Sequence, residues 1–127
     1  MKNVSDLKVL KDYDALNDSL FMFIGGDIEY KESIEINDHL ILDFDKKGEI
    51  VSFEILDVSK ILGVDKFSIK NLKKLRGNIG VNKDFIVVEF TFTVPVHQKN
   101  LEKPIFIEAP NDLNLPDTTA SLGLATA

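Results

Sequence analysis

Apolar and polar residues alternate along much of the first half of the chain, as they do in β-strands that bury one face. This alternation, together with one continuous apolar run, predicts five short strands: Val9–Tyr13, Leu20–Ile24, Ser33–Ile36, His39–Phe44 and Glu49–Leu56. Short polar turns separate most of these segments, which is typical of antiparallel strands joined in a meander.

A short helix is predicted directly after the last of these strands. Asp57 or Ser59 is suited to the N-cap of a helix over Val58–Leu62, because a short polar side chain there accepts a hydrogen bond from a free backbone N–H. Gly63 follows at the position where a helix commonly ends in the left-handed conformation. We therefore expect the meander to lead into a helix.

The second half of the chain predicts another helix and a hairpin. Ser68 can cap a helix over Ile69–Leu75, in which apolar residues recur every third position, and residues Gly77–Asp84 are expected to form a loop. The strongest strand pattern in the chain covers Phe85–Val94, and a short strand over Ile105–Glu108 is predicted to return along it at the edge of the sheet.

These elements predict an α+β fold. We expect an antiparallel β-meander over residues 9–56, covered on one face by the short helices, with the C-terminal hairpin either extending the sheet or forming a second layer. Residues 1–108 would form a single domain, and residues 109–127, which contain two prolines and show no periodic pattern, would form a mobile tail. Leu20–Ile24 is apolar on both sides, so we expect a homodimer that buries one face or edge of a small sheet.

Composition narrows the classes of function. The chain has 127 residues, no cysteine and a formal net charge of −6. Residues 1–14 contain no apolar stretch typical of a signal peptide, and no apolar run in the sequence approaches the roughly 20 residues of a membrane span, so we expect a cytoplasmic protein without membrane contact. Its basic residues concentrate in residues 66–76, and we interpret these as a solvated helix face, which makes nucleic-acid binding a minor hypothesis. An acidic surface favours a basic protein partner.

Aspartates in the turns are the candidates for metal or acid–base chemistry. Asp43, Asp45, Gly48 and Glu54 follow the spacing of a calcium loop, but Lys47 occupies a ligand position, and the flanking strands would carry Glu54 away from the turn. We therefore interpret the segment as a hairpin turn.

Two further aspartates, Asp14 and Asp18, flank the first predicted turn. If these and the pair at Asp43 and Asp45 converged, they could bind a divalent ion or act as a hydrolase. We expect them to cap turns instead, and so expect no cofactor. His39 and His97 are far apart in the sequence and show no metal-ligand spacing. Catalytic groups are not evident, which favours a non-enzymatic function and leaves the question of an enzyme open.

Two segments resemble a known family. The first carries Tyr13-Asp14-x-x-x-Asp18-x-Leu20. The second runs from Ile36-Asn37-Asp38 through Leu42-Asp43-Phe44-Asp45 and Gly48-Glu49-Ile50-Val51 to Glu54-Ile55-Leu56-Asp57-Val58-Ser59. Together they resemble the signatures Y-D-x-x-x-D-x-L and I-L-D-Y-D-x-x-G-x-I-V-G-I-E-I-L-D-A-S of a small prokaryotic domain-of-unknown-function family. The resemblance covers about residues 11–62 and leaves residues 63–108 as an extension.

The resemblance implies a small antiparallel sheet that ends in a short helix, and it implies no activity. Genes of this kind are associated with small toxin-like partners, which suggests an antitoxin-like role. Our leading hypothesis is therefore a non-enzymatic protein-interaction module that binds a small basic protein. The alternative is a divalent-ion-binding protein or hydrolase that uses the turn aspartates.

Overall fold

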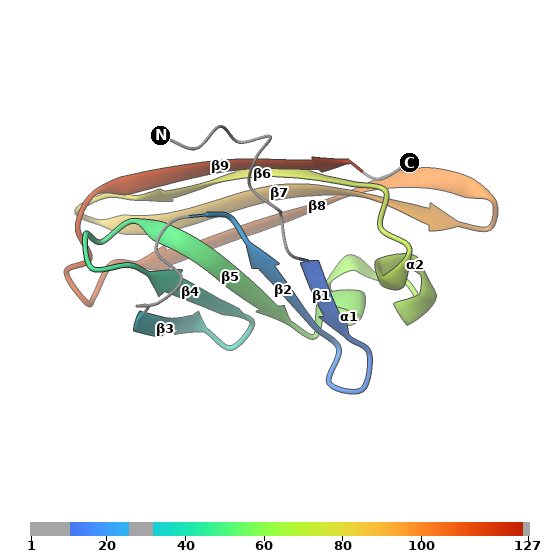
Figure 1. Ribbon diagram of the computed structural model, residues 1–127, viewed down its shortest axis with the longest axis horizontal. Helices are drawn as coiled ribbons and strands as arrows, with labels where there is room; N and C mark the ends of the chain where they lie inside the picture. The colour runs from blue at the N-terminus through green and yellow to red at the C-terminus, as the bar shows by residue number, and fades with distance from the viewer. Residues whose placement is uncertain (1–10, 26–31, 126–127) are drawn as a thin grey trace.

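The computed structural model describes residues 11–25 and 32–125. This part of the chain is built almost entirely of antiparallel β-structure in two sheets, with two helices of five residues each (Figure 1). The prediction of an α+β fold is therefore wrong, and the protein has a β-rich fold. The predicted strand at Val9–Tyr13 begins outside the described residues.

Sheet A contains five strands in the order β1-β2-β5-β4-β3. Their bounds are Lys11–Asp14 (β1), Ser19–Phe23 (β2), Glu32–Asn37 (β3), Leu40–Phe44 (β4) and Ile50–Leu56 (β5). The sheet is not the simple meander predicted, because β2 pairs with β5 instead of with β3. A β1–β2 hairpin is thus added to a β3-β4-β5 meander at its β5 edge, and all neighbouring strands run antiparallel.

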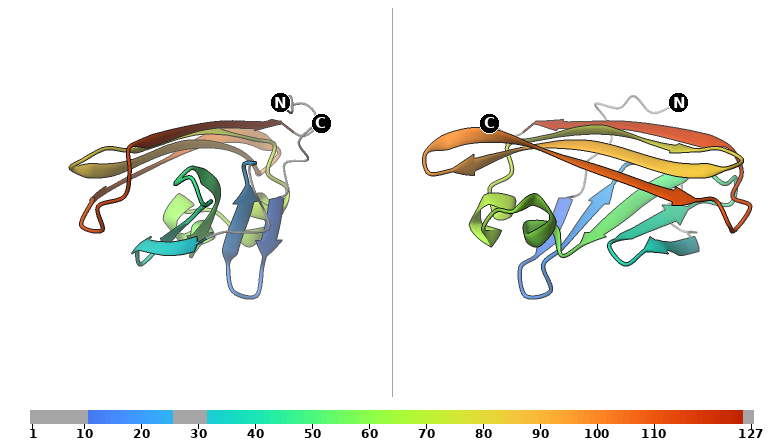
Figure 2. Two further views of the ribbon diagram at one scale, coloured as in Figure 1. Left: turned by 60° about the vertical axis from the view of Figure 1, so that its left-hand side comes forward. Right: turned by 180° about the vertical axis from the view of Figure 1, so that it is seen from behind.

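Sheet B contains four longer strands in the order β8-β7-β6-β9. Their bounds are Lys74–Val81 (β6), Phe85–Val96 (β7), Lys99–Pro110 (β8) and Thr118–Ala125 (β9). Figure 1 shows sheet B lying across sheet A as a second layer, and the rear view in Figure 2 shows the β7–β8 hairpin extending past the helices.

Two segments of sheet B correct the predictions for the second half of the chain. The segment expected to be a loop, Gly77–Asp84, lies mostly in β6, which pairs with β7 on one side and β9 on the other. Residues Thr118–Ala125, which were expected in a mobile tail, form β9 along the whole of β6. Both strands are weak by local pattern, with glycine or small residues at many positions, so it is the pairing with neighbouring strands that defines them.

Helix α1 (Val58–Leu62) and helix α2 (Lys66–Lys70) form the connection between the two sheets. They lie together at one end of the molecule, beside the β1–β2 hairpin (Figure 1). The first helix has the predicted bounds, and Gly63 ends it in the left-handed conformation with φ 68°, which confirms its predicted role. The second helix starts and ends earlier than predicted, and the face of sheet A is covered by sheet B instead of by helices.

The hydrophobic core lies between the two sheets. Strands β2 and β5 of sheet A supply fully buried residues such as Leu20, Met22 and Phe53, and β7 supplies Phe90 and Phe92 from sheet B. The ring of Phe53 lies 4.7 Å from that of Phe90, centroid to centroid, and so joins the two layers at the centre of the core. The opposite face of sheet A, which we call its outer face, points away from this core.

Candidate functional site

The β1–β2 turn holds the first two candidate aspartates in different environments. Asp14 is exposed, and its carboxylate accepts hydrogen bonds from the backbone N–H groups of Leu16 (3.0 Å) and Asn17 (3.2 Å) and from the Asn17 side chain (2.7 Å). These bonds, with that of the Asn17 side chain the strongest influence, hold the pKa of Asp14 below its ordinary value. Asp14 therefore stabilises the turn, as the sequence predicted.

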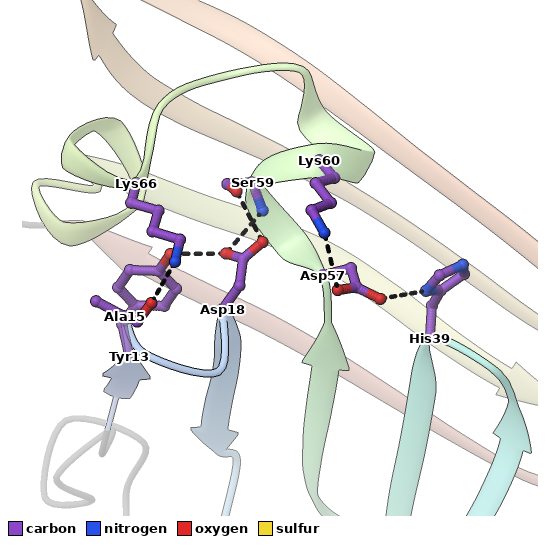
Figure 3. A network of polar contacts seen from close by, with 8 residues as sticks. All are labelled: Tyr13, Ala15, Asp18, His39, Asp57, Ser59, Lys60 and Lys66. Carbon is purple, nitrogen blue, oxygen red and sulfur yellow. Dashed lines mark hydrogen bonds and ion pairs between the residues drawn. The ribbon is translucent and has the colours of Figure 1, made fainter.

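Asp18 is buried and connects this turn to helix α1 (Figure 3). Its carboxylate accepts hydrogen bonds from the Tyr13 hydroxyl (2.7 Å), the Ser59 hydroxyl (2.7 Å) and the Ser59 backbone N–H (3.1 Å). Its own backbone carbonyl accepts a bond from the N–H of Val58 (3.2 Å). Asp18 thus satisfies the first N–H groups of a helix that begins 40 residues later in the chain.

Neither of the two predicted caps acts as one: Ser59 lies inside the helix, and Asp57 does not cap the helix with its side chain. It precedes α1 with φ 57°, in the left-handed region, and makes no side-chain capping bond. Its carboxylate instead lies 3.5 Å from Nδ1 of His39 and 3.9 Å from Nζ of Lys60, on the exposed side of the helix start (Figure 3). Asp18 was not predictable as the cap, because a cap supplied by a distant strand leaves no local signal in the sequence.

Hydrogen bonds keep the Asp18 carboxylate ionised although it is buried. Burial alone would raise the pKa of Asp18, but the bonds from Tyr13 and Ser59, with the charge of Lys66, outweigh burial and place the pKa below its ordinary value. Burial and the neighbouring Asp18 carboxylate raise the pKa of the Tyr13 phenol far above its ordinary range. At neutral pH the network is therefore an ionised carboxylate bound by neutral donors.

The geometry does not form a nucleophilic site. The Ser59 hydroxyl donates to Asp18, whereas His39 pairs with Asp57, so the hydroxyl and the imidazole are engaged with different carboxylates. Nucleophilic catalysis needs the hydroxyl bonded to the base that removes its proton. Lys66 adds a bond of 2.6 Å from Nζ to the carbonyl of Ala15 and ties α2 to the same turn. The network holds the helices against sheet A.

The second pair of aspartates lies on the β4–β5 hairpin. Asp43 is buried and accepts hydrogen bonds from the hydroxyls of Ser33 (2.5 Å) and Ser52 on the neighbouring strands. Asp45 accepts bonds from the backbone N–H groups of Lys47 (2.9 Å) and Glu49 (3.0 Å). Asp43 is thus engaged by hydroxyls of β3 and β5, and Asp45 by backbone groups of the hairpin turn.

The four candidate aspartates do not converge. Strand pairing places Ser19, which follows Asp18, opposite Leu56, while Asp43 pairs with Ser52, so the two sites are separated by roughly 13 Å along β5. Within residues 11–25 and 32–125, no three His, Cys, Asp or Glu side chains are grouped so that they could hold a metal ion. No observation on this part of the chain favours the ion-binding alternative.

The basic segment of residues 66–76 is divided between two elements. Lys66 and Lys70 lie on α2, whereas Lys74 and Arg76 lie on β6, where Arg76 pairs with Glu102 at 3.3 Å. The sequence had suggested that these cations lie on one helix face, and the structure shows that they do not.

The outer face of sheet A carries a feature that was not predicted from the sequence. Strand register aligns five residues from the five strands in one row: Asp12, Phe21, Glu54, Ile41 and Glu35. We call this set the acidic row. Carboxylates and apolar side chains alternate along it, and with strands about 4.8 Å apart it spans about 19 Å.

The acidic row is accessible to different degrees along its length. Asp12 and Glu35, at the two ends, are exposed, whereas Phe21, Glu54 and Ile41 are half-buried. The Ser19 hydroxyl donates to Glu54 and fixes the central carboxylate. The alternation within each strand could have revealed these residues as outward-facing, but their alignment required the strand order, in which β5 lies between β2 and β4.

Comparisons with known proteins agree with the family resemblance. The family described as "Protein of unknown function (DUF2283)" matches residues 12–59, which comprise the strands of sheet A and the start of α1. This supports the resemblance at the level of a family of unknown function and does not test the individual motif positions. No helix in the described residues is long and apolar enough to cross a membrane.

Two relatives align over most of the chain. An uncharacterized protein of Methanocaldococcus jannaschii is 30% identical over 118 residues, which are 92% of this chain and 100% of that protein. A Methanosarcina mazei protein named "Putative hypoxanthine phosphoribosyltransferase" is 33% identical over 113 residues, which are 89% of this chain and 90% of that protein. Both alignments must include most of sheet B, so these proteins share more than the family segment. No solved structure matches the chain.

Proposed function

Given that the chain belongs to the family described as "Protein of unknown function (DUF2283)", whose description carries no activity, we propose that it is a protein-interaction module that binds a basic partner protein on the outer face of sheet A. The acidic row is the observation that carries this proposal. In its finer form the proposal is antitoxin-like: forming the complex, and thereby occupying the partner, is the function.

The charge of the outer face supports a basic partner. Strand alternation and register place 12 described residues on it: Asp12, Asp14, Ser19, Phe21, Phe23, Ser33, Glu35, Ile41, Asp43, Ser52, Glu54 and Leu56. None of these residues is Lys or Arg. Carboxylates concentrated on one face attract a cationic partner and accelerate its association, and they disfavour acidic competitors.

Apolar side chains between the carboxylates supply contact area. Protein interfaces combine a desolvated apolar centre with a polar rim, and aromatic residues are enriched in that centre. In the acidic row Phe21 and Ile41 flank Glu54, while Asp12 and Glu35 lie at the rim. A partner segment with Lys or Arg alternating with apolar residues would match this order.

The test is a binding measurement with charge-reversed variants. Any small basic protein encoded next to this gene is a candidate partner, to be co-expressed with the chain and purified. We expect D12K/E35K, which changes only the two exposed ends of the acidic row, to weaken binding roughly tenfold to hundredfold and to reduce its dependence on salt. The control, E89K/E108K, makes the same charge change on the outward-facing side of sheet B and should bind normally.

Two outcomes would contradict the proposal. One is equal loss of binding in both double variants, which would show a dependence on net charge alone. The other is purification of the chain without any bound partner after co-expression with each candidate basic protein.

The name of the Methanosarcina mazei relative provides an enzymatic alternative, and the helix starts argue against it. Phosphate groups bind favourably at helix N-termini, where free N–H groups and the helix dipole attract anions. Here α1 and α2 have five residues each and are preceded by Asp57 and Asp65, whose carboxylates repel phosphate. An assay of the purified chain with hypoxanthine decides the matter, because hypoxanthine phosphoribosyltransferase turnover would replace the interaction proposal.

A further inference from the structure

Each sheet ends in two edge strands, and an edge strand exposes unpaired backbone N–H and C=O groups that can pair with another chain. In the described residues these edges are β1 and β3 in sheet A and β8 and β9 in sheet B. Proteins protect such edges with short strands, charged residues, prolines or bulges. The four edges differ in how far they are protected.

Three of the edges carry recognisable protection. Strand β1 has only four residues and includes charged side chains, and β3 contains two glutamates and an irregular register between Glu35 and Asn37. Strand β8 is long but contains Lys99, Glu102, Lys103 and Glu108 together with two prolines. Charges and prolines disfavour pairing of these edges with another strand.

The fourth edge, β9, has no such protection. It pairs with β6 through all eight of its residues, Thr118–Ala125, and its sequence TTASLGLA contains no charged residue and no proline. Its outward-facing residues Thr119, Ser121 and Gly123 are small and exposed, and Ala120 and Leu122 pack against the core. Over residues 118–123 these small, uncharged side chains leave room for a further strand.

We propose that β9 pairs with β9 of a second copy of this chain, so that the two copies of sheet B form one continuous antiparallel sheet across a two-fold axis. A homodimer was expected from the apolar run Leu20–Ile24. One side of that run, Leu20 and Met22, is buried in the core, whereas Phe21 and Phe23 on its other side lie half-buried on the outer face that we assign to a different partner. The dimer contact is instead placed on the other sheet.

Charge is the reason for choosing a second copy as the occupant. Two copies that each carry a net charge of −6 repel one another, so a contact between copies must avoid carboxylates. Strand β9 is uncharged, whereas pairing of β1 or β3 with its own copy would bring Asp12 or Glu35 close to its equivalent. Like charges directly opposite one another destabilise a strand pair.

The two-fold axis also limits the register. Opposite residues of an antiparallel pair point to the same face, and an axis perpendicular to the sheet preserves that face. Pairs must therefore join positions that are both odd or both even. The two registers that overlap most of β9 place Ser121 opposite Ser121, or Leu122 opposite Leu122. In either register the two Ser121 residues lie within about 8 Å of each other.

Light scattering on the purified full chain at about 50 µM gives the first test, with an expected mass of twice 14.3 kDa. The variant T119K/S121K adds two exposed lysines per copy to the β9 edge, and we expect its dimer dissociation constant to rise by tenfold or more. A control variant, N100K, adds a lysine to the exposed β8 edge and should remain dimeric. Circular dichroism confirms that each variant is folded.

The absence of cysteine permits a second test that does not depend on weakening the contact. The variant S121C should form a covalent dimer with a thiol cross-linker of about 8 Å, whereas N100C on β8 should not. A monomeric wild-type chain at this concentration would overturn the proposal, as would equal cross-linking of both cysteine variants. Binding of a basic partner on sheet A is measured separately, so the dimer proposal and the partner proposal can each be refuted without the other.

Discussion

Replacing Asp18 with Asn tests whether this buried carboxylate holds helix α1 against sheet A. Asn has nearly the same shape and tolerates the left-handed backbone at this position, φ 54°, so neither packing nor backbone strain changes much. The three donors from Tyr13 and Ser59 remain, but the carboxylate that accepts them is replaced by an amide. The substitution therefore isolates the contribution of the charge and its acceptors.

The expected loss follows from the three hydrogen bonds. A bond to an ionised group contributes about 1.5–3 kcal/mol and a neutral one about 0.5–1.5 kcal/mol, so each bond loses about 1 kcal/mol. The amide NH₂ also faces one of the donors, which leaves that donor unsatisfied. We expect D18N to lower the free energy of unfolding by about 3 kcal/mol, which shifts the urea midpoint by roughly 1.5–2 M.

Urea unfolding at pH 7, followed by circular dichroism, measures this shift. The matched control is D14N in the same turn, where Asp14 is exposed and the amide can still accept the turn's backbone bonds, so its midpoint should stay close to that of the wild type. A D18N midpoint indistinguishable from that of D14N would refute the reasoning, because burial and the bond to α1 would then contribute nothing measurable.

The pH dependence provides a second check on the same variant. The pKa of Asp18 is lower in the folded protein than its ordinary value near 4, so its stabilising contribution is present above about pH 4 and is lost as the pH falls through the folded pKa. The difference in stability between the wild type and D18N should therefore narrow in acid. An unchanged difference at pH 2.5 would point to altered packing instead of charge.

Three further substitutions test the core, a close strand contact and the tyrosine. F53A removes a fully buried ring that contacts Phe90 and should lower the free energy of unfolding by about 3–5 kcal/mol in urea titrations. G77A places a Cβ 2.1 Å from a backbone carbonyl oxygen of β7 and should cost about 3 kcal/mol or more, whereas G80A, with open space around it, should stay within about 0.5 kcal/mol. Y13F should cost about 1 kcal/mol at pH 7, and its difference from the wild type should narrow above pH 10, because the folded pKa of Tyr13 is raised and its contribution is lost as the phenol ionises.

Local pattern identified the strands of sheet A, most of them by the alternation of a strand that buries one face and Leu20–Ile24 by its continuous apolar run. Local pattern failed at the start of β6. Ile69, Leu72 and Leu75 are spaced as on one face of a helix, so a helix was predicted to continue to Leu75. The helix instead ends at Lys70, and Leu75 lies in β6. Strand β9 gave no signal at all, because small uncharged residues have little preference of their own and the strand is defined by β6 beside it.

The contacts of the candidate aspartates also differ in how far they were predictable from local sequence. The roles of Asp14 and Asp45 in turns were predictable, because their partners lie within a few residues in the sequence. The capping of α1 by Asp18 and the pairing of Asp43 with Ser33 and Ser52 were not, because those partners lie on other strands.

By itself the sequence determined which segments of sheet A are strands, where the first helix ends at Gly63, and how the turns at Asp14 and Gly48 are made, since these depend on contacts within a few residues. Only the tertiary structure decided that β5 lies between β2 and β4 and that a second sheet covers the core. Strand order depends on long-range pairing, which local periodicity does not encode. That order aligns the acidic row and leaves β9 at an edge, so the two surfaces proposed for binding exist only in the folded chain.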